Sequence, residues 1–234
     1  MKKLFVVLLL ISAFYSCNKN NPETVNINEK DIASFQLSMD SIIADTTKII
    51  STELPILIDS ARSILIYEVK IMGISEKSFG KLNSYSKDGG YSTNYITNLI
   101  FEEVPLNSKN TLTDLSLNIW SYSFQEEIYN KTGKKFIFYT ITDSDSNKNN
   151  ALDYVDIKSF YISDIDGTSF SKVTKNNENF SEGKYISPLN RYYFKTIEET
   201  DKYNILATKH FYYIDFNKEP YQIEEYFPLD ILKK

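Results

Sequence analysis

Twelve residues from Asp145 to Asp156, DSNKNNALDYVD, place oxygen-bearing side chains at a spacing that suits a hard cation. Calcium takes about six to eight oxygen ligands from carboxylates, amide groups and backbone carbonyls. The predicted ligands are five side chains at loop positions 1, 3, 5, 9 and 12 and one backbone carbonyl at position 7: Asp145, Asn147, Asn149, Asp153, Asp156 and Ala151. The spacing predicts one structural Ca²⁺ site, and Asp143 just upstream is a further candidate ligand.

Two other loop positions fit this interpretation. Asn150 stands where the chain must turn with positive φ, a conformation that asparagine adopts more readily than most residues. The loop resembles an EF-hand or dockerin-type calcium loop, with Asp156 in place of the usual closing glutamate. Its flanks read as strands rather than helices, so the resemblance implies a structural site without a conformational switch. The alternative is a solvated hairpin loop in which Asp and Asn only favour turns.

The segments on either side of the loop predict the strands that position it. Phe136–Thr142 and Ser159–Ser163 are rich in aromatic and β-branched residues, which favour strands. A turn at Ser163–Thr168 leads to a third strand that ends near Val173 and Thr174. Further strands are predicted at Ser63–Met72, Thr97–Val104 and Leu117–Phe124, with turns at Ser86–Gly90 and Asn130–Gly133 and a short helix followed by a strand within Glu29–Ser51.

The C-terminal part of the chain repeats the central part. Phe138–Ile141 matches Phe194–Ile197, and Tyr161–Asp164 matches Tyr213–Phe216. Together with the turn Ser163–Thr168, these units resemble blades of TolB-type and WD40-like propellers, over about residues 95–227. The predicted fold class is all-β: an incomplete or four-bladed propeller-like stack of antiparallel sheets, with a sandwich as the alternative.

The first residues predict an export signal. Lys2 and Lys3 precede an apolar run from Leu4 to Ala13, and the single cysteine of the chain, Cys17, follows. Phe14–Cys17 resembles the lipobox of a bacterial lipoprotein, as in small lipoproteins of the Bacteroidetes type. The resemblance implies a signal peptide over 1–16, a lipidated Cys17 with a tether over 17–50, a β-rich domain over 51–234, and an outer-membrane location in the cell envelope. A buried first helix of a cytosolic protein is the alternative.

Composition and motifs argue against two classes of function. The formal net charge of −5 provides no basic patch for nucleic acid. The paired carboxylates Glu102-Glu103, Glu126-Glu127, Glu198-Glu199 and Glu224-Glu225 read as strand neighbours, which point to opposite faces. His210, the only histidine, is expected to share a face with Tyr212 and Ile214. With no nucleophile or metalloprotease motif in the chain, we expect a protein that is not an enzyme.

Aromatic residues are the remaining indication of function. Six of them are candidates for a flat binding surface, and the alternative is that alternate rings are core: Trp120, Tyr122, Tyr192, Tyr193, Tyr212 and Tyr213. The sequence therefore favours a non-catalytic binding or scaffolding module that is attached to the membrane by its N-terminal lipid and binds an envelope protein or a glycan. The alternatives are a glycan-binding accessory lipoprotein of a nutrient-uptake system and a hydrolase with an unmarked acidic site.

Overall fold

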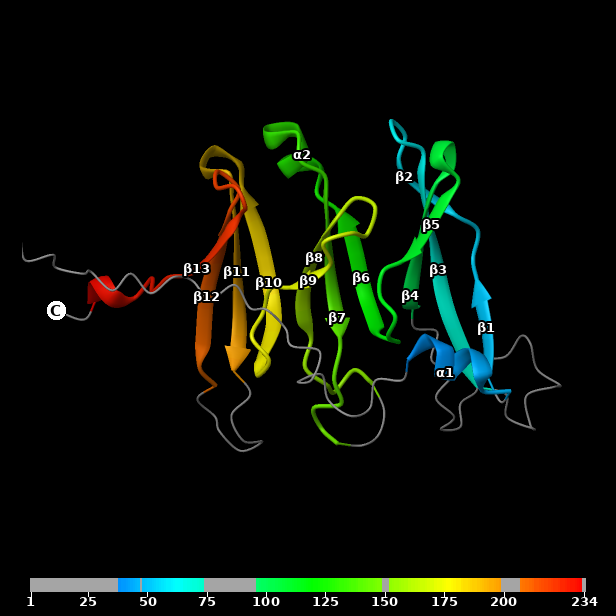
Figure 1. The fold of residues 1–234 in the computed structure, drawn as a ribbon. Helices are drawn as coiled ribbons and strands as arrows, with labels where there is room; N and C mark the ends of the chain where they lie inside the picture. The colour runs from blue at the N-terminus through cyan, green and yellow to red at the C-terminus, as the bar shows by residue number, and fades with distance from the viewer. Residues whose placement is uncertain (1–37, 47, 74–95, 149–151, 199–206, 233–234) are drawn as a thin grey trace, which may run out of the picture.

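The computed structural model describes residues 38–46, 48–73, 96–148, 152–198 and 207–232. The leader, Cys17, most of the predicted tether and the predicted turn at 86–90 lie outside these residues. Figure 1 shows the described elements as three layers of antiparallel strands placed face to face.

Each layer collects neighbouring segments of the chain. The N-terminal layer contains α1 (Met39–Ala44), β1 (Lys48–Thr52), β2 (Ile56–Asp59), β3 (Ile64–Gly73), β4 (Ile96–Glu103), the 3₁₀ turn η2 (Val104–Leu106) and β5 (Ser108–Thr111). The central layer contains β6 (Asn118–Phe124), α2 (Glu126–Thr132), β7 (Phe136–Thr142), β8 (Ser159–Asp164) and β9 (Ser171–Lys172). The C-terminal layer contains β10 (Glu178–Ile186), η3 (Ser187–Leu189), β11 (Arg191–Glu198), β12 (Lys209–Asp215), β13 (Gln222–Glu225) and η4 (Asp230–Leu232).

Hydrogen bonding joins the first two layers into one strongly bent sheet. Its order is β1-β3-β4-β6-β7-β8-β9, with β2 and β5 paired to β3 and β4. Only the pair Ile96 and Ile119 connects β4 with β6, so the sheet folds over at this point. The C-terminal layer is a separate four-stranded sheet of order β10-β11-β12-β13. The described strands thus form two antiparallel sheets, neither of which closes, and the predicted all-β class is confirmed.

The central layer is buried on both of its faces. Along β7, Ile137, Tyr139 and Ile141 belong to the core shared with the N-terminal layer. The alternate residues Phe136 and Phe138 belong to the core shared with the C-terminal layer. Successive side chains of a strand point to opposite sides, so a strand packed on both sides needs an uninterrupted apolar run. The sequence FIFYTIT meets that need, which explains why the predicted strand Phe136–Thr142 is confirmed residue for residue.

The turn between β8 and β9 attaches the central layer to the N-terminal layer. Gly167 has φ of +81°, and a Cβ placed on it would lie 2.5 Å from the ring of Phe101. Arg62 donates to Glu103 at 2.6 Å and to Asp166 at 3.1 Å, so one guanidinium joins β4 to this turn. Glycine is therefore needed in this turn for two reasons: it adopts the positive φ, and its lack of a Cβ lets the two layers come close together.

One predicted turn is wrong. Asn130–Thr132, proposed as part of a turn, are the last residues of helix α2, and Gly133 caps the helix with φ of +75°. Ile128 of this helix is fully buried in the second core, and Glu126 and Glu127 lie in the first turn, where the helix dipole favours acidic side chains. A helix this short has too few turns to produce a recognisable apolar period, so burial of Ile128 decides its conformation.

The predicted helix and strand near the N-terminus are confirmed in their described part. Ser38 caps α1 by accepting a hydrogen bond from the Ser41 backbone N–H, and Ile42 is buried. Met39 N–H donates to the carbonyl of Asp114 at 2.9 Å. The folded body therefore includes residues from Ser38, upstream of the expected domain boundary at residue 51.

Candidate functional site

The acidic loop between β7 and β8 is closed by one carboxylate. Asp156 is 2% exposed. Its Oδ1 accepts hydrogen bonds from Ser146 Oγ and from the Asn147 backbone N–H, both at 3.1 Å, and its Oδ2 accepts one from the Asp153 backbone N–H at 2.9 Å. Ser146 Oγ in turn accepts from the Ile157 N–H at 3.0 Å. Asp156 thereby holds the two ends of the loop together through protein donors.

This geometry bears on the predicted calcium ligands. Asn149 and Ala151 lie outside the described residues, and Asp153 Oδ1 accepts from the Val155 N–H at 2.8 Å. Asp156 Oδ1 already accepts two hydrogen bonds, so coordination of a cation through this atom would displace one of its donors. Among the described residues, no group of three or more His, Cys, Asp or Glu side chains is placed to hold a metal ion. Calcium binding stays a prediction, and the loop itself is organised by Asp156.

A buried ionic cluster supports the base of the loop. Asp143 Oδ2 accepts from Tyr161 OH at 2.6 Å and from Lys172 Nζ at 2.7 Å, and Oδ1 accepts from Ser159 Oγ at 3.2 Å. Burial and the neighbouring Asp143 raise the pKa of the Tyr161 phenol. Lys172 also donates to Asn176, so its ammonium group has two oxygen partners inside the protein. Buried charges persist only when paired in this way, which gives Asp143 a structural role at the junction of β7, β8 and β9.

A second polar cluster lies at one end of the C-terminal layer. His210 Nδ1 is 2.8 Å from Glu225 Oε1, and Nε2 is 3.5 Å from Glu198 Oε2. Burial alone would lower the pKa of His210, but hydrogen bonds and charges from Glu225, Glu178 and Glu198 outweigh burial and raise it. The histidine stacks at 6.3 Å on Tyr212, which confirms the expected shared face.

Glu178 is the buried member of this cluster. Its carboxylate accepts from Thr196 Oγ1 and from Tyr212 OH, each at 2.7 Å. Lys175 Nζ lies 3.4 Å from Glu225 and 5.4 Å from the Tyr212 ring centroid. The sequence gives no motif for this cluster, because the register of β10, β11, β12 and β13 brings together residues that are far apart in the chain.

The paired carboxylates separate as predicted where both members are described on a strand; Glu126 and Glu127 lie in helix α2, so the strand prediction is wrong for that pair. Glu224 accepts from Tyr213 OH on one face of β13, whereas Glu225 approaches His210 on the other. Glu102 accepts from Tyr67 OH, and Glu103 accepts from Arg62. Neither pair directs its two carboxylates at a common point.

The six aromatic candidates do not form one surface; alternate rings pack against the cores, as the alternative interpretation expected. Tyr212 and Tyr192 face the second core, and Tyr122 packs against the first. Trp120 lies at a register shift in β6, donates to Thr142 Oγ1 at 2.9 Å and has Lys158 Nζ 4.8 Å from its ring centroid. Layer packing decides which rings turn inward, and the alternation along a strand does not reveal which of its faces is covered.

Tyr193 and Tyr213 do lie together, on the side of the C-terminal layer opposite its core. Phe211 and Tyr226, which the sequence did not single out, complete this group; we call the four residues the outer aromatic face. Ring centroids are 5.5 Å apart for Tyr193 and Tyr213, 5.5 Å for Tyr193 and Tyr226, and 5.9 Å for Phe211 and Tyr226. All four side chains are partly exposed.

Charged groups border the outer aromatic face. The Arg191 guanidinium carbon lies 4.3 Å from the Tyr213 ring centroid, which is a cation–π geometry. Burial, together with Glu224, raises the pKa of Tyr213 to about 12, so the phenol remains protonated at neutral pH. The face thus combines apolar ring surface with charged and hydroxyl groups, a combination that suits ligands with both apolar and polar parts.

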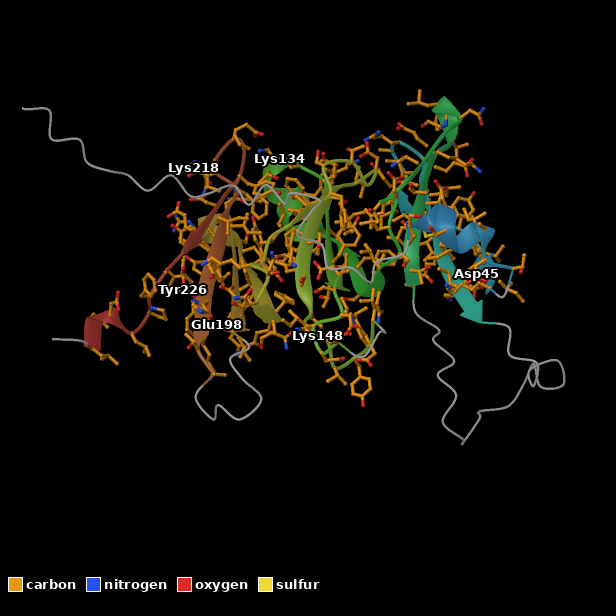
Figure 2. All side chains as sticks on the ribbon, turned by 60° about the horizontal axis from the view of Figure 1, so that its bottom comes forward. Asp45, Lys134, Lys148, Glu198, Lys218 and Tyr226 are labelled. Carbon is orange, nitrogen blue, oxygen red and sulfur yellow. The ribbon has the colours of Figure 1, made fainter. Side chains whose placement is uncertain are left out.

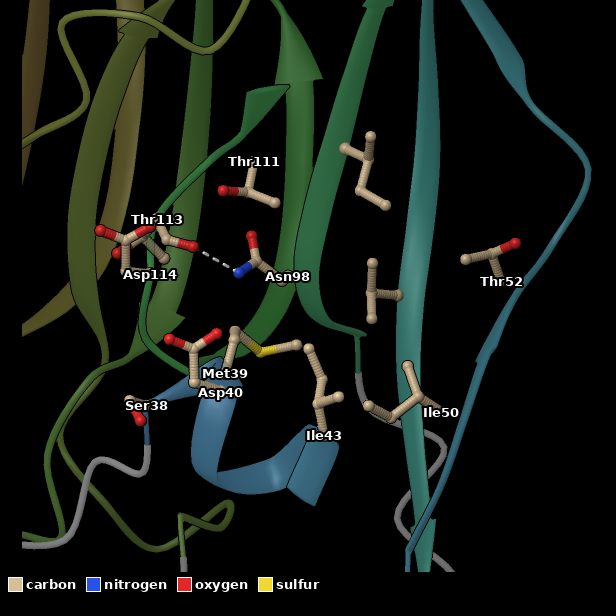
Figure 3. A pocket seen from close by; sticks show the side chains of 12 residues that line it. Ser38, Met39, Asp40, Ile43, Ile50, Thr52, Asn98, Thr111, Thr113 and Asp114 are labelled. Carbon is tan, nitrogen blue, oxygen red and sulfur yellow. Dashed lines mark hydrogen bonds between the residues drawn. The ribbon is translucent and has the colours of Figure 1, made fainter. Parts of the chain in front are cut away.

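A cleft lies on the opposite end of the stack, between α1 and the outer surface of the N-terminal layer (Figure 3). Its volume is about 420 Å³, and its apolar lining includes Met39, Ile43, Ile50, Val69 and Ile100. Asp40 and Asp114 also line it. We call this feature the α1 cleft.

Comparison with known proteins gives no relative. No protein-family model, no curated protein and no solved structure matches the chain. In the part of the chain that the structure describes, no helix is long and apolar enough to span a bilayer.

Proposed function

We propose that this protein is a lipid-anchored component of the cell envelope whose β-layers form a non-catalytic binding or scaffolding module. The observation that carries the binding role is the outer aromatic face. Four partly exposed aromatic residues gather on one side of a sheet whose other side is the core. Aromatic rings contribute most to recognition surfaces because they provide a large contact area with little loss of side-chain freedom.

A glycan-binding accessory role is the second candidate, and a specific feature of the face favours it. Tyr193 and Tyr213 are cross-strand partners with a ring-centroid distance of 5.5 Å. The same sheet carries Arg191 on β11, Glu224 on β13 and Lys184 on β10. Sugar rings present an apolar C–H face and hydroxyl groups at the edge, which fits aromatic rings flanked by polar side chains.

The proposed architecture is an incomplete propeller-like stack. The order β6-β7-β8-β9 and the order β10-β11-β12-β13 are both antiparallel runs of consecutive strands. The two runs pack face to face through one apolar core. Consecutive four-stranded units packed in this way support an interpretation as propeller blades.

A glycan array tests the binding role and separates the two candidates. The double variant Tyr193→Ala/Tyr213→Ala removes the centre of the face, and Tyr154→Ala is the control, because Tyr154 is an exposed tyrosine in the loop between β7 and β8. Saturable glycan binding that is lost in the double variant and kept in the control supports the glycan-binding role. Absence of glycan binding, with a stoichiometric envelope protein recovered by wild type and control but not by the double variant, supports scaffolding. Turnover of a peptide or glycoside by the purified protein would overturn both.

The membrane anchor has its own test. Cells that express the chain are labelled with a palmitate analogue, and Cys17→Ala is compared with wild type. The lipobox resemblance predicts that label and membrane fractionation are both lost in the variant. Labelling that persists in Cys17→Ala contradicts anchoring at this residue.

A further inference from the structure

The α1 cleft has an acidic side and an apolar side. Figure 3 shows Asp40 and Asp114 on the side of the cleft opposite Ile50. The Met39 N–H donates to the Asp114 carbonyl at 2.9 Å, so the two acidic residues belong to adjacent backbone segments. The volume of about 420 Å³ lies within the roughly 300–1,000 Å³ that is usual for ligand sites. The cleft therefore suits a ligand that has both a cationic and an apolar part.

Part of the apolar lining is in contact with water. Ile43 and Ile50 are 65% and 36% exposed, whereas Val69, which lines the same cleft, is 4% exposed. An occupant that covered the two isoleucines would remove their apolar surface from water, at about 25 cal/mol per Å². Apolar side chains that gather in a cleft and remain exposed are typical of an interaction site rather than of a core.

The charges of the N-terminal layer are paired except at this cleft. Every other described carboxylate from residue 38 to residue 114 forms an ion pair: Asp45 with Lys48, Glu53 and Glu68 with Lys70, Asp59 with Lys135, Glu102 with Lys109, and Glu103 with Arg62. The same pairs engage every described lysine and arginine of this range. Asp40 and Asp114 form no ion pair within the described part of the chain. The negative charge that lacks a partner is therefore concentrated at the cleft, where it favours a cationic occupant.

We propose that the α1 cleft binds a peptide segment of a partner protein in which a lysine or arginine lies beside large aliphatic side chains. The cationic head group pairs with Asp40 and Asp114, and the aliphatic side chains cover Ile43 and Ile50. The position of β1 favours a peptide over a small amine. Among the described strands β1 pairs only with β3, so its other edge presents backbone groups to which an extended peptide can hydrogen-bond.

This inference goes beyond the proposed function and does not depend on it. The outer aromatic face belongs to the C-terminal layer and the α1 cleft to the N-terminal layer, with the central layer between them (Figure 1). The labelled residues in Figure 2 agree, since Asp45 at the end of α1 and Tyr226 of the outer aromatic face are far apart. The two surfaces can therefore be tested separately.

Fluorescence anisotropy of labelled synthetic peptides tests the proposal on the full chain as cells produce it. The buffer contains phosphatidylcholine nanodiscs, and nanodiscs alone are the blank. In the peptide panel the numbers of basic and of large aliphatic residues vary independently. Wild type is expected to bind peptides with both kinds of residue at least tenfold more tightly than peptides with only one kind.

Two double variants remove the two parts of the site. Asp40→Asn/Asp114→Asn and Ile43→Ser/Ile50→Ser are each expected to lower the affinity for the best peptide at least tenfold. Glu126→Gln/Glu127→Gln is the control, because it changes the net charge as much as the first variant does but lies in α2 of the central layer. The control is expected to bind as wild type does.

A charge reversal separates loss of the site from loss of the fold. Asp40→Lys/Asp114→Lys is expected to prefer acidic aliphatic peptides to basic ones, a gain that an unfolded chain does not produce. The proposal is overturned if wild type does not prefer basic aliphatic peptides, or if the Asp40→Asn/Asp114→Asn variant binds as the control does. Competition by hexylamine as strong as that by the peptide would identify a small amine as the ligand. Self-association in sedimentation velocity that Asp40→Asn/Asp114→Asn abolishes would identify a second copy, and either result overturns the proposal.

Discussion

The strand pairs β7-β8 and β11-β12 have similar sequences but different surroundings. Phe138–Ile141 matches Phe194–Ile197 in sequence, yet every described side chain of β7 except Thr140 is buried, whereas β11 buries only Phe194 and Thr196. The same contrast holds between β8 and β12. β7 and β8 lie between two layers, and β11 and β12 have a neighbouring layer on one side only.

This difference shows that strand pairs of similar sequence can be covered on both faces or on one face only. In the central layer both faces contribute to cores, so its side chains determine stability. In the C-terminal layer only one face packs against a neighbouring layer, and the other face carries the outer aromatic face. The strand pair at the end of the stack therefore leaves one face uncovered, and our proposed binding surface lies on that face.

The largest expected effect tests the central layer directly. Phe160→Ala in β8 removes a ring that is 1% exposed and contacts Phe138, Phe180 and Phe194. It is expected to lower the free energy of unfolding by about 3–5 kcal/mol, because it leaves a cavity between layers. Phe211→Ala on the outer aromatic face is the comparison and is expected to cost no more than about 1 kcal/mol. Urea denaturation measures both, and equal losses would contradict the difference between the layers.

The second-largest loss of stability is expected from substitution of Gly167, in the turn between β8 and β9. Gly167→Ala combines an unfavourable left-handed backbone with a clash against Phe101, and a loss of about 2–4 kcal/mol is expected. Gly133→Ala has the same backbone requirement but nothing within 4 Å of the added Cβ, so it is expected to cost only about 1 kcal/mol. The difference in melting temperature between the two variants isolates the contact between layers. Similar melting temperatures for the two variants would show that the Phe101 ring moves aside without loss of stability.

The acidic loop allows a test that separates closure from metal binding. Asp156→Asn replaces an oxygen that accepts N–H bonds by an NH₂ group and is expected to cost about 1–3 kcal/mol in metal-free buffer. If the loop binds calcium, millimolar Ca²⁺ raises the melting temperature of wild type, and Asp145→Asn abolishes that increase. No calcium-dependent change in wild type would remove the predicted Ca²⁺ site while leaving the closing role of Asp156 in place.

The smallest expected effect concerns the cluster around His210. The pKa of this histidine is raised above 6.5, so its charge stabilises the folded state fully below that pH, and the contribution disappears as pH rises through the folded-state pKa. The free energy of unfolding of wild type relative to His210→Gln is therefore expected to be larger by about 0.5 kcal/mol at pH 5.5 than at pH 9. Glu178, Glu198, Glu225 and Lys175 are present in both proteins, so their titration largely cancels. A difference that grows with pH would be evidence against the ion pairs of His210.

The local sequence was sufficient to predict the strands that form the two cores. The run FIFYTIT and the alternation in Ser63–Met72 correspond to β7 and β3 because apolar and β-branched residues specify extended backbone at short range. The divergence of Glu224 and Glu225 follows from the same two-residue period. Fold class and most strand positions were therefore predictable from residues that are neighbours in the chain.

For the acidic loop and the polar clusters, the sequence predicted which residue types are present but not which partners they contact. Asp156 as a cation ligand stays a prediction, whereas its hydrogen bonds to Ser146, Asn147 and Asp153, which close the loop, were not foreseen from the sequence. The pairing of Asp143 with Lys172 and that of His210 with Glu225 join segments that no local pattern relates. The sequence shows which oxygen atoms are available as ligands or hydrogen-bond acceptors. The donor that each oxygen meets depends on which distant segment the fold brings next to it.

Sequence alone determined that this chain forms antiparallel strands, because period and propensity act within a few residues. Tertiary structure alone decided that β7 is covered twice and β11 once, that Tyr212 turns inward while Tyr213 stays at the surface, and that Ile128 makes α2 a helix. The physical reason is that burial is a property of layers in contact. A strand carries two faces in its sequence, but the packing of the neighbouring layers determines which of them meets water.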